Sequence, residues 1–252
     1  MTSSRERRER SALVIGGASG IGAAVVEIYR ARDVPTTVWD VAGSCDVRCD
    51  IAEPAAIDRA LRETVESRGI PHWVTVTAGI GHSGLLTETS PDEWDRVMQV
   101  NARGPWLCLR ALARAMADAQ LSGSMVATSS VSAHLVDRTM GAYCASKAAL
   151  SMLVKVAAFE WGPLGIRVNA IGPGVTQTPM LGPTPATSPW LSGVSDRTPL
   201  GRLGQSPDIA EAIVSLHQME WVTGQVLDCD GGLSLYSPID SYGVTRRRPR
   251  DQ

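Results

Sequence analysis

The chain has 252 residues, 44% of them hydrophobic, which is enough for one domain with a full core. Its formal net charge of −2 excludes the general attraction to nucleic acid or anionic membranes that strongly basic proteins have. We find no apolar run near the roughly 18 residues of a membrane span, and no apolar segment of a secretory signal behind the charged N-terminus. We therefore expect one cytoplasmic domain over residues 1–252, with a charged tail at 1–10 and a basic tail at 245–252.

Apolar runs and helical periodicity alternate along the first third of the chain. Strands are expected at 12–16, 36–39 and 73–77, with helices from Gly20 to Arg32 and from Pro54 to Arg68. Only nine residues separate Asp40 from Asp50, and they must contain another strand. This is too short for a helical crossover, so we expect a truncated third strand there.

The same alternation continues to the end of the chain. Ser90 and Glu93 form a capping box that opens a helix to about Val100. Further helices are expected at about 106–118, from Tyr143 to about Trp161, and after Ser206, with strands at 124–129, 167–171 and 225–229. Strands alternating with helices predict an α/β domain whose parallel sheet is covered on both faces.

Five cysteines are scattered at positions 45, 49, 108, 144 and 229. Cys45 and Cys49 have no second ligand pair at the spacing of a zinc site. We therefore expect no metal, and free thiols in a reducing cytosol.

A glycine-rich turn joins the first strand to the first helix, with the spacing G-x-x-x-G-x-G. Glycines at this point allow a tight turn and close approach of a pyrophosphate to the helix N-terminus. The residues expected to bind a dinucleotide here are Gly16, Ser19, Gly20, Ile21 and Gly22.

Asp40 follows the second strand, where a carboxylate can accept hydrogen bonds from both ribose hydroxyls of an adenosine. It would repel a 2′-phosphate, and neither Val41 nor Ser19 supplies a basic group to offset it. NAD is therefore expected rather than NADP. The alternative is that Asp40 caps only its own loop.

Tyr143 and Lys147 are one helical turn apart, so their side chains share a face. An ammonium beside a phenol is expected to lower the pKa of the phenol towards working pH. Such a phenol can take a proton from an alcohol or give one to a ketone. Taken alone, the pair also fits an ordinary exposed helix.

The glycine-rich turn, Asp40 and the Tyr143/Lys147 pair follow one another along the chain as they do in the short-chain dehydrogenase/reductase superfamily, and the chain resembles its compact single-domain branch. The resemblance runs from about Ala12 to Gly232 and adds Asp50-Ile51, Ala78-Gly79, Val100-Asn101, Ser129-Ser130, Asn169, Pro173-Gly174, Thr178 and Asp230-Gly231-Gly232. It implies a Rossmann-type, doubly wound sheet of about seven parallel strands flanked by helices on both faces. It also implies a catalytic set of Asn101, Ser130, Tyr143 and Lys147.

The resemblance implies a role for each of these residues. Ser130 would bind the substrate oxygen, and Tyr143 would be the acid/base. Lys147 would tune Tyr143 and bind the nicotinamide ribose, and Asn101 would support a water linked to Lys147. The remaining implied NAD contacts are Asp50, Ile51, Ala78, Gly79, Pro173, Gly174, Val175 and Thr178.

The chain departs from the family pattern in two places, since the family has a threonine where this chain has Ile15 and two asparagines where it has Val76-Thr77. These side chains brace the central strands, so we expect altered bracing and not lost activity.

The segment 177–202 is rich in proline, serine and threonine, and in the family the equivalent stretch closes over substrate. Together with Ser130 and Tyr143, the residues expected at the substrate are Ser132, His134, Met140, Met180 and Trp190. His134 fits a structural role equally well. The mostly apolar set favours a hydrophobic secondary alcohol or ketone.

Local features resemble bacterial 3α-hydroxysteroid dehydrogenase/carbonyl reductases and dihydrodiol dehydrogenases, which both imply a cyclic substrate. A 3-oxoacyl-carrier-protein reductase and a non-catalytic dinucleotide sensor are the alternatives. The helices at 106–118 and 143–161 resemble those of the family's dimer contact, and the second is apolar on more than one face. We therefore expect a homotetramer, built as a dimer of dimers.

Overall fold

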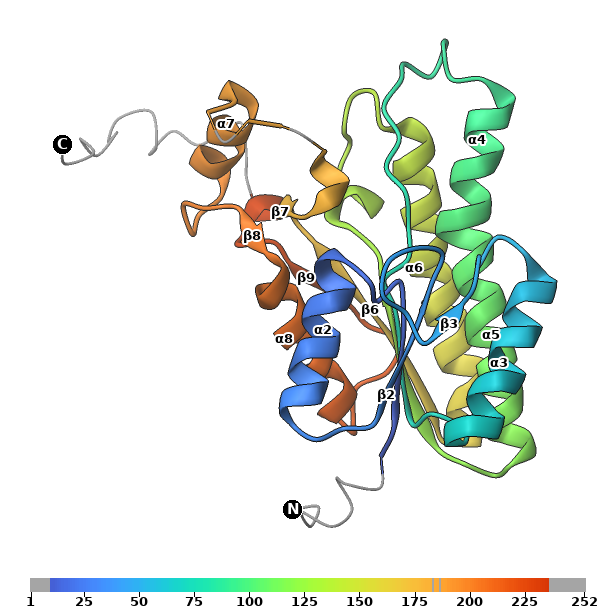
Figure 1. Ribbon diagram of the computed structural model, residues 1–252. Coiled ribbons are helices and arrows are strands. Elements are labelled where there is room, and N and C mark those ends of the chain that lie inside the picture. Colours follow the sequence, from blue (N-terminus) through green and yellow to red (C-terminus); the bar gives the residue numbers. More distant parts are fainter. Residues whose placement is uncertain (1–9, 183, 186, 236–252) are drawn as a thin grey trace.

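A seven-stranded parallel sheet runs through the middle of the molecule (Figure 1). The computed structural model describes residues 10–182, 184–185 and 187–235. The strand order is β3-β2-β1-β4-β5-β6-β9, so the order reverses between β1 and β4. The strands are β1 (Ala12–Ile15), β2 (Thr36–Asp40), β3 (Val47–Arg48), β4 (Trp73–Val76), β5 (Gly123–Thr128), β6 (Ile166–Pro173) and β9 (Val226–Cys229).

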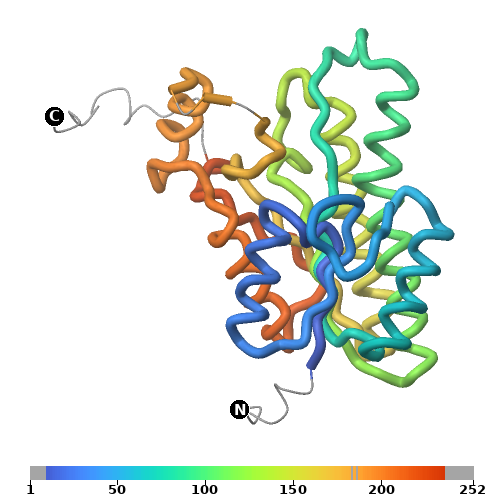
Figure 2. The backbone as a smooth tube through the Cα atoms, viewed as in Figure 1, coloured from blue at the N-terminus to red at the C-terminus, as the bar shows by residue number. Residues whose placement is uncertain are grey.

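Helices cover both faces of this sheet (Figure 2). One face carries α2 (Gly20–Ala31) and α8 (Ser206–Gln218), which pack against each other. The other face carries α3 (Pro54–Arg68), α5 (Gly104–Asp118) and α6 (Gly141–Trp161), with α4 (Pro91–Met98) leading into α5. The predicted fold class, a Rossmann-type sheet of seven parallel strands between two helical layers, is confirmed.

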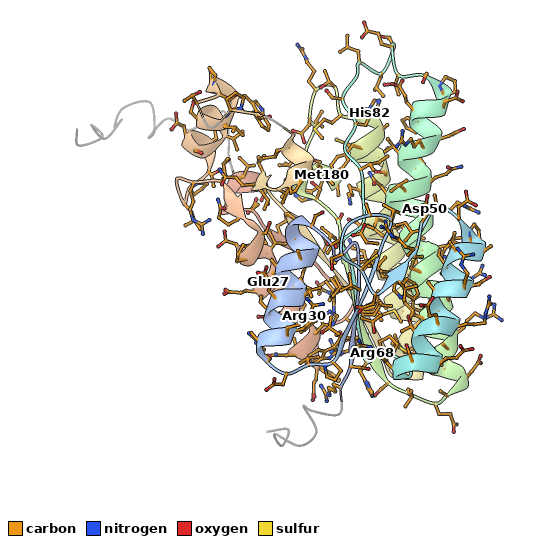
Figure 3. All side chains as sticks on the ribbon, in the orientation of Figure 1. Glu27, Arg30, Asp50, Arg68, His82 and Met180 are labelled. Atoms are coloured by element: carbon orange, nitrogen blue, oxygen red, sulfur yellow. The ribbon has the colours of Figure 1, made fainter. Side chains whose placement is uncertain are left out.

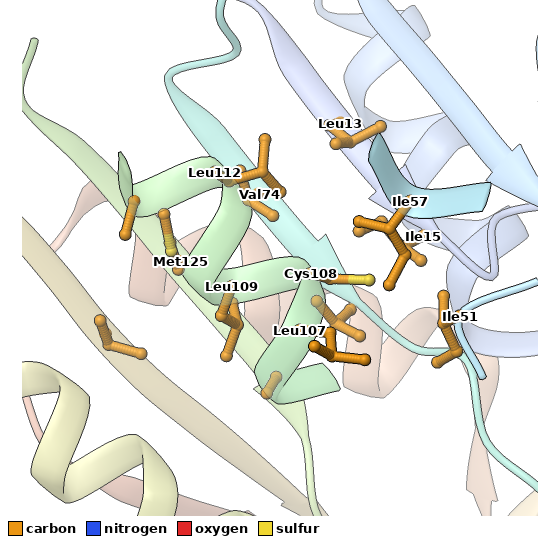
Figure 4. Packing of buried hydrophobic residues seen from close by; sticks show 14 of the residues in the cluster. Leu13, Ile15, Ile51, Ile57, Val74, Leu107, Cys108, Leu109, Leu112 and Met125 are labelled. Carbon is orange, nitrogen blue, oxygen red and sulfur yellow. The ribbon is translucent and has the colours of Figure 1, made fainter. Parts of the chain in front are cut away.

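The core on the α3/α5/α6 face is built from the apolar runs that predicted the strands (Figure 4). Leu13 and Val74 of neighbouring strands pack against Leu112 of α5, and Ile57 of α3 is buried beside Ile15. All four residues of β1 are buried, because helices lie on both sides of it. The truncated third strand is also confirmed, since β3 has only two residues.

The helices expected to be separate near residues 100–106 are joined by a π-helical turn, η1 (Gln99–Arg103). Pro105 has no N–H, so it cannot donate the α-helical hydrogen bond to the carbonyl of Asn101. The wider turn absorbs this missing bond, and it places the Asn101 side chain in the interior, fully buried. Such turns are frequent at functional sites.

The segment 177–202, rich in proline, serine and threonine, is partly helical. It contains a short 3₁₀ turn, η4 (Pro179–Leu181), and a helix, α7 (Pro189–Arg197), and it lies between the paired strands β7 (Thr176–Gln177) and β8 (Gly204–Gln205). Pro189 occupies the first turn of α7, and Leu191, Val194 and Leu203 form a small core of their own. The helix has nine residues, and its two buried apolar residues, Leu191 and Val194, are too few to form a recognisable helical pattern in the sequence.

One helix corrects the expectation that the chain has no apolar segment of membrane-spanning character. An 18-residue window within residues 141–164, which comprise α6 and the turn after it, has a mean hydropathy of 1.3, so by length and composition alone this segment could cross a membrane. Helices in the core of a protein have the same length and composition, and Leu150 and Val154 of α6 are buried against the sheet.

All five cysteines are free thiols, as expected. Apart from Arg10, the two expected tails lie outside the described residues.

A buried histidine links α8 to the sheet. The ring of His217 lies 3.0 Å from the hydroxyl of Thr75 on β4 and 3.0 Å from that of Ser124 on β5. It also stacks on Trp73, with ring centroids 5.9 Å apart. Burial, with the nearby Arg167 guanidinium, lowers the pKa of His217 to about 3. The neutral ring is therefore the form that the fold holds.

We predict that this histidine makes the protein sensitive to acid. In the unfolded chain His217 binds a proton near pH 6.5, whereas in the folded chain it does so only near pH 3. Its contribution to stability is complete above pH 6.5 and is lost as the pH falls towards 3, at up to about 1.4 kcal/mol per pH unit. Chemical denaturation of native protein and of His217→Gln between pH 8 and 4 checks this. The variant should show a shallower loss, and an equal slope in both proteins would contradict the assignment.

Candidate active site

A cavity of about 840 Å³ opens at the carboxyl edge of the sheet, where the strand order reverses. Ligands of doubly wound sheets bind at this point. Figure 3 labels two of the lining residues, Asp50 after β3 and Met180 after β7, on different sides of the central strands. Every residue that the sequence assigned to the cofactor lines this cavity: Gly16, Ser19, Gly20, Ile21, Gly22, Asp40, Asp50, Ile51, Ala78, Gly79, Tyr143, Lys147, Pro173, Gly174, Val175 and Thr178.

The glycine-rich turn is packed so tightly that two of its glycines have no room for a side chain. A Cβ on Gly22 would lie 2.1 Å from the carbonyl oxygen of Gly16. Gly16 has a φ of +86°, and a Cβ there would lie 2.5 Å from the amide nitrogen of Ala78. The turn thus leaves the N-terminus of α2 open to the cavity, and its free N–H groups can receive a pyrophosphate.

The departure from the family pattern at Thr77 is compensated locally. Its hydroxyl lies 3.1 Å from the carbonyl oxygen of Ile15 and 2.9 Å from that of Gly16, so it ties β4 to the glycine-rich turn. This agrees with the expectation of altered bracing.

Asp40 sits at the end of β2, beside the same turn. One carboxylate oxygen accepts from the N–H of Ala18, at 2.9 Å, and the other from the N–H of Val41, at 2.7 Å. Asp40 therefore does cap its own loop, the alternative left open from the sequence. It also lines the cavity, and a carboxylate has further lone pairs for ribose hydroxyls.

Lys147 reaches the cavity from the inner face of α6. Its side chain is almost fully buried, and the Nζ atom donates to the carbonyl oxygen of Thr128, 2.8 Å away at the end of β5. The same Nζ lies 5.6 Å from the centre of the Tyr143 ring. Burial disfavours the charged amine and lowers the pKa of Lys147 to about 8.

The expected depression of the Tyr143 pKa is not found in the chain alone. Burial raises the pKa of Tyr143, and a hydrogen bond with Ser130 only partly offsets this effect. The charges of Cys144 and Asp137 raise it further. The sequence placed the two side chains on one face correctly, but it could not reveal how dry that face is.

Asn101 braces the site from behind and does not line the cavity. Its amide oxygen accepts from the N–H of Ile80, at 2.8 Å, while its amide nitrogen donates to the Ile80 carbonyl, at 2.9 Å. The nitrogen also lies 3.2 Å from the Ser146 hydroxyl on α6. One buried amide therefore holds the backbone after β4 against the helix that carries Tyr143 and Lys147.

Ser130 follows the end of β5, two residues after Thr128. It precedes the 3₁₀ turn η2 (Val131–Ala133), and its hydroxyl accepts from the N–H of Ser132, 3.1 Å away. Ser132 in turn donates its own hydroxyl to Asp137, at 2.6 Å. Both serines line the cavity beside Tyr143.

Comparisons with known proteins agree with this geometry. A family model described as "Enoyl-(Acyl carrier protein) reductase" matches residues 17–234. The 2,5-dichloro-2,5-cyclohexadiene-1,4-diol dehydrogenase of Sphingobium indicum is 33% identical, over 89% of this chain and 97% of that protein. The (3R)-3-hydroxyacyl-CoA dehydrogenase of Canis lupus familiaris is 32% identical, over 93% and 100%. The solved structure of 4-hydroxyisoleucine dehydrogenase complexed with NADH has a TM-score of 0.85 and 26% identity, over 90% and 100%.

The chain belongs to the short-chain dehydrogenase/reductase superfamily. It is an NAD(P)-dependent oxidoreductase that acts on CH–OH groups. The residues of the cavity fit such a dinucleotide, because the glycine-rich turn presents backbone N–H groups and excludes side chains where the pyrophosphate would approach.

The residues expected at the substrate also line the cavity of this dehydrogenase, with one exception. Met140, Met180 and Trp190 line the cavity together with the two serines. His134 does not; its Nε2 lies 3.2 Å from a carboxylate oxygen of Asp228 on β9, so the ring turns away from the cavity. The structural alternative for His134 is the one that the geometry supports.

Several cavity residues were missed from the sequence. They are Arg96 on α4, Leu135, Val136 and Asp137 before α6, Val194 and Arg197 on α7, and Leu233 and Ser234 after β9. Those on α7 were missed because the helix itself was not recognised. The residues of the loop before α6 could have been predicted, because this loop directly connects two residues expected at the substrate, Ser132 and Met140.

Proposed function

We propose that the protein is an NAD-dependent dehydrogenase that transfers a hydride between nicotinamide and a secondary alcohol or ketone on a hydrophobic, cyclic substrate. The observation that carries the proposal is one cavity lined at once by the glycine-rich turn, by Asp40, and by Ser130, Tyr143 and Lys147. A proton-transfer group thus shares a cavity with a dinucleotide cradle.

In the oxidation direction, Ser130 and Tyr143 hold the alcohol oxygen. The phenolate oxygen of Tyr143 takes the hydroxyl proton as the carbon–oxygen double bond forms. The hydrogen on carbon leaves with its electron pair as a hydride, which a nicotinamide held in this cavity would accept. Lys147 and Asn101 hold this arrangement from α6 and η1, and Lys147 is placed to bind the nicotinamide ribose.

The other cavity residues divide between the two ends of the dinucleotide. Asp40 would bind the adenosine ribose, with Asp50 and Ile51 at the adenine. The backbone at Ala78 and Gly79 would pass close to the adenosine ribose. The segment Pro173–Val175 and Thr178 would face the nicotinamide end.

The wall around the reacting groups supports a hydrophobic ring as substrate. Leu135, Met140, Met180, Leu181 and Trp190 line it with apolar side chains. The name of the Sphingobium indicum relative describes a cyclic diol as its substrate. A second candidate, an acyl thioester, is favoured by the name of the Canis relative. A panel of cyclic alcohols, steroids, dihydrodiols and 3-hydroxyacyl thioesters separates the two candidates.

Assembly into a homotetramer is part of the proposal. Met152, Val156 and Phe159 are spaced along one side of α6, and Phe159 is 87% exposed. Trp106 on α5 is also exposed. An apolar stripe of this kind is typical of a subunit contact. We also place the enzyme in the cytoplasm, in keeping with its free thiols.

We predict that Tyr143→Phe lowers kcat for alcohol oxidation by roughly 10²- to 10⁴-fold, since it removes the proton carrier. Oxidation by the native enzyme should rise with pH, because burial raises the pKa of Tyr143 and the phenolate is the active form. Tyr29→Phe, which removes a buried phenol outside the cavity, is the control and should keep native turnover. Steady-state rates from pH 7 to 11 check both points; near-native turnover of Tyr143→Phe would refute the role.

We predict that Asp40 sets the choice of NAD over NADP. Asp40→Ala should weaken NAD binding by roughly 1.5–3 kcal/mol and strengthen NADP binding, because the carboxylate no longer repels a 2′-phosphate. Asp40→Asn, which can still accept from the loop N–H groups, isolates the charge. Asp46→Asn, outside the cavity, is the matched control. Dissociation constants for both cofactors decide the matter, and a native preference for NADP would sink the proposal.

We predict that light scattering at micromolar concentration gives four times the chain mass of 26.8 kDa. Phe159→Asp should reduce the assembly, because a carboxylate in an apolar contact loses its hydration. A clean native monomer with normal turnover would rule out the tetramer and leave the chemistry untouched.

A further inference from the structure

One carboxylate lies on the substrate side of the cavity, whose lining is mostly apolar but also includes Arg96 and Arg197. Three acidic residues of the described chain line it. Asp40 and Asp50 follow β2 and β3, at the cofactor end, and Asp137 lies in the loop between η2 and α6, beside Met140. We propose that Asp137 selects substrates that carry a second hydroxyl group, so that the enzyme acts on cyclic diols in preference to single alcohols. This inference rests on the proposed function.

Asp137 is linked directly to the groups that would hold the reacting oxygen. Its Oδ2 accepts from the Ser132 hydroxyl at 2.6 Å, and the Ser132 N–H donates to the Ser130 hydroxyl at 3.1 Å. Within the described part of the chain, the Ser132 hydroxyl is the hydrogen-bond donor to this carboxylate, and it occupies Oδ2. The other oxygen keeps its acceptor sites for a ligand.

The loop that carries Asp137 is held in an unusual conformation. Thr139 has a φ of +71°, which is rare and strained for a β-branched residue. Its carbonyl oxygen accepts from the N–H of Gly84 at 2.7 Å, and its hydroxyl lies 3.1 Å from that of Ser83. Such strain persists where the surroundings fix the backbone. The loop is therefore fixed at Thr139, two residues after Asp137, against Ser83 and Gly84.

The chemistry of this position favours a particular ligand. An ionised carboxylate only accepts hydrogen bonds, and a hydroxyl can donate one. A ring whose first hydroxyl meets Ser130 and Tyr143 can present a second hydroxyl to Asp137. A single alcohol offers no second hydroxyl to this carboxylate, which belongs to an exposed residue. Asp137 also contributes to the raised pKa of Tyr143, which agrees with its lying near the phenol.

The competing reading is that Asp137 merely fixes Ser132, and through it Ser130. The two readings differ in what they predict for different substrates. Loss of a positioning contact lowers oxidation of every alcohol. Loss of a substrate contact lowers oxidation of diols alone, chiefly through KM.

The test is steady-state oxidation by the full chain with NAD, using cyclohexanol, cyclohexane-1,2-diol and cyclohexane-1,4-diol. The native enzyme should prefer at least one diol over cyclohexanol by about tenfold or more in kcat/KM, as expected for a hydrogen bond to a charged group. Asp137→Ala should abolish that ratio through a higher KM for the diol. Asp137→Asn, whose amide oxygen still accepts a hydrogen bond but carries no charge, should reduce the ratio. Glu88→Gln, which changes an exposed carboxylate outside the cavity, should keep it. The ratio is measured within each variant, so a partial loss of folded protein does not affect it. A native enzyme without diol preference, or variants that keep the ratio, would overturn the inference.

Calorimetry with NADH present separates this inference from the proposed function, because no oxidation is possible with the reduced cofactor. Diol should bind the native protein more tightly than cyclohexanol does, and Asp137→Ala should remove the difference. This result would stand even if neither alcohol were oxidised, in which case the proposed function alone fails. Equal binding of diol and cyclohexanol to the native protein would overturn the role of Asp137.

Discussion

Burial of the Lys147 side chain constrains every element around the cavity, because an amine that leaves water needs a protein partner in place of its hydration. The Thr128 carbonyl is that partner, so the end of β5 and the inner face of α6 must stay in register. Gly79 closes the space from the third side. A Cβ there would lie 3.6 Å from Lys147 Nζ and 3.2 Å from the amide oxygen of Asn101. Three segments far apart in sequence therefore meet at one nitrogen atom.

Asn101 extends the same constraint to the cofactor end. Its amide pairs with both backbone groups of Ile80, so the chain leaving β4 cannot move independently of η1. At the end of β4, the Thr77 hydroxyl joins this chain to the end of β1 and the glycine-rich turn. The π-helical turn before Pro105 is what allows Asn101 to point inwards between α4 and α5. The cradle and the proton-transfer groups are thus parts of one connected framework.

Sequence patterns predicted those features that depend on neighbouring residues. The alternation of strands and helices, the short β3, the turn at Gly16 and the shared face of Tyr143 and Lys147 are all encoded within a few positions. The features that failed depend on distant partners. His134 turns to Asp228 on another strand, and α7 is held by a small cluster that includes Leu203 and Leu233 from outside the helix. Neither contact leaves a local signal.

The direction of the Tyr143 pKa is the most instructive of these differences. Burial pushes Tyr143 and Lys147 towards their neutral forms together, raising the pKa of the phenol and lowering that of the amine. A site without water disfavours both the ammonium and the phenolate that the spacing of the two residues predicts. The hydrogen bond from Ser130 opposes the shift but does not reverse it. The pH at which oxidation rises is therefore set by the balance between burial of the phenol and its hydrogen bond with Ser130.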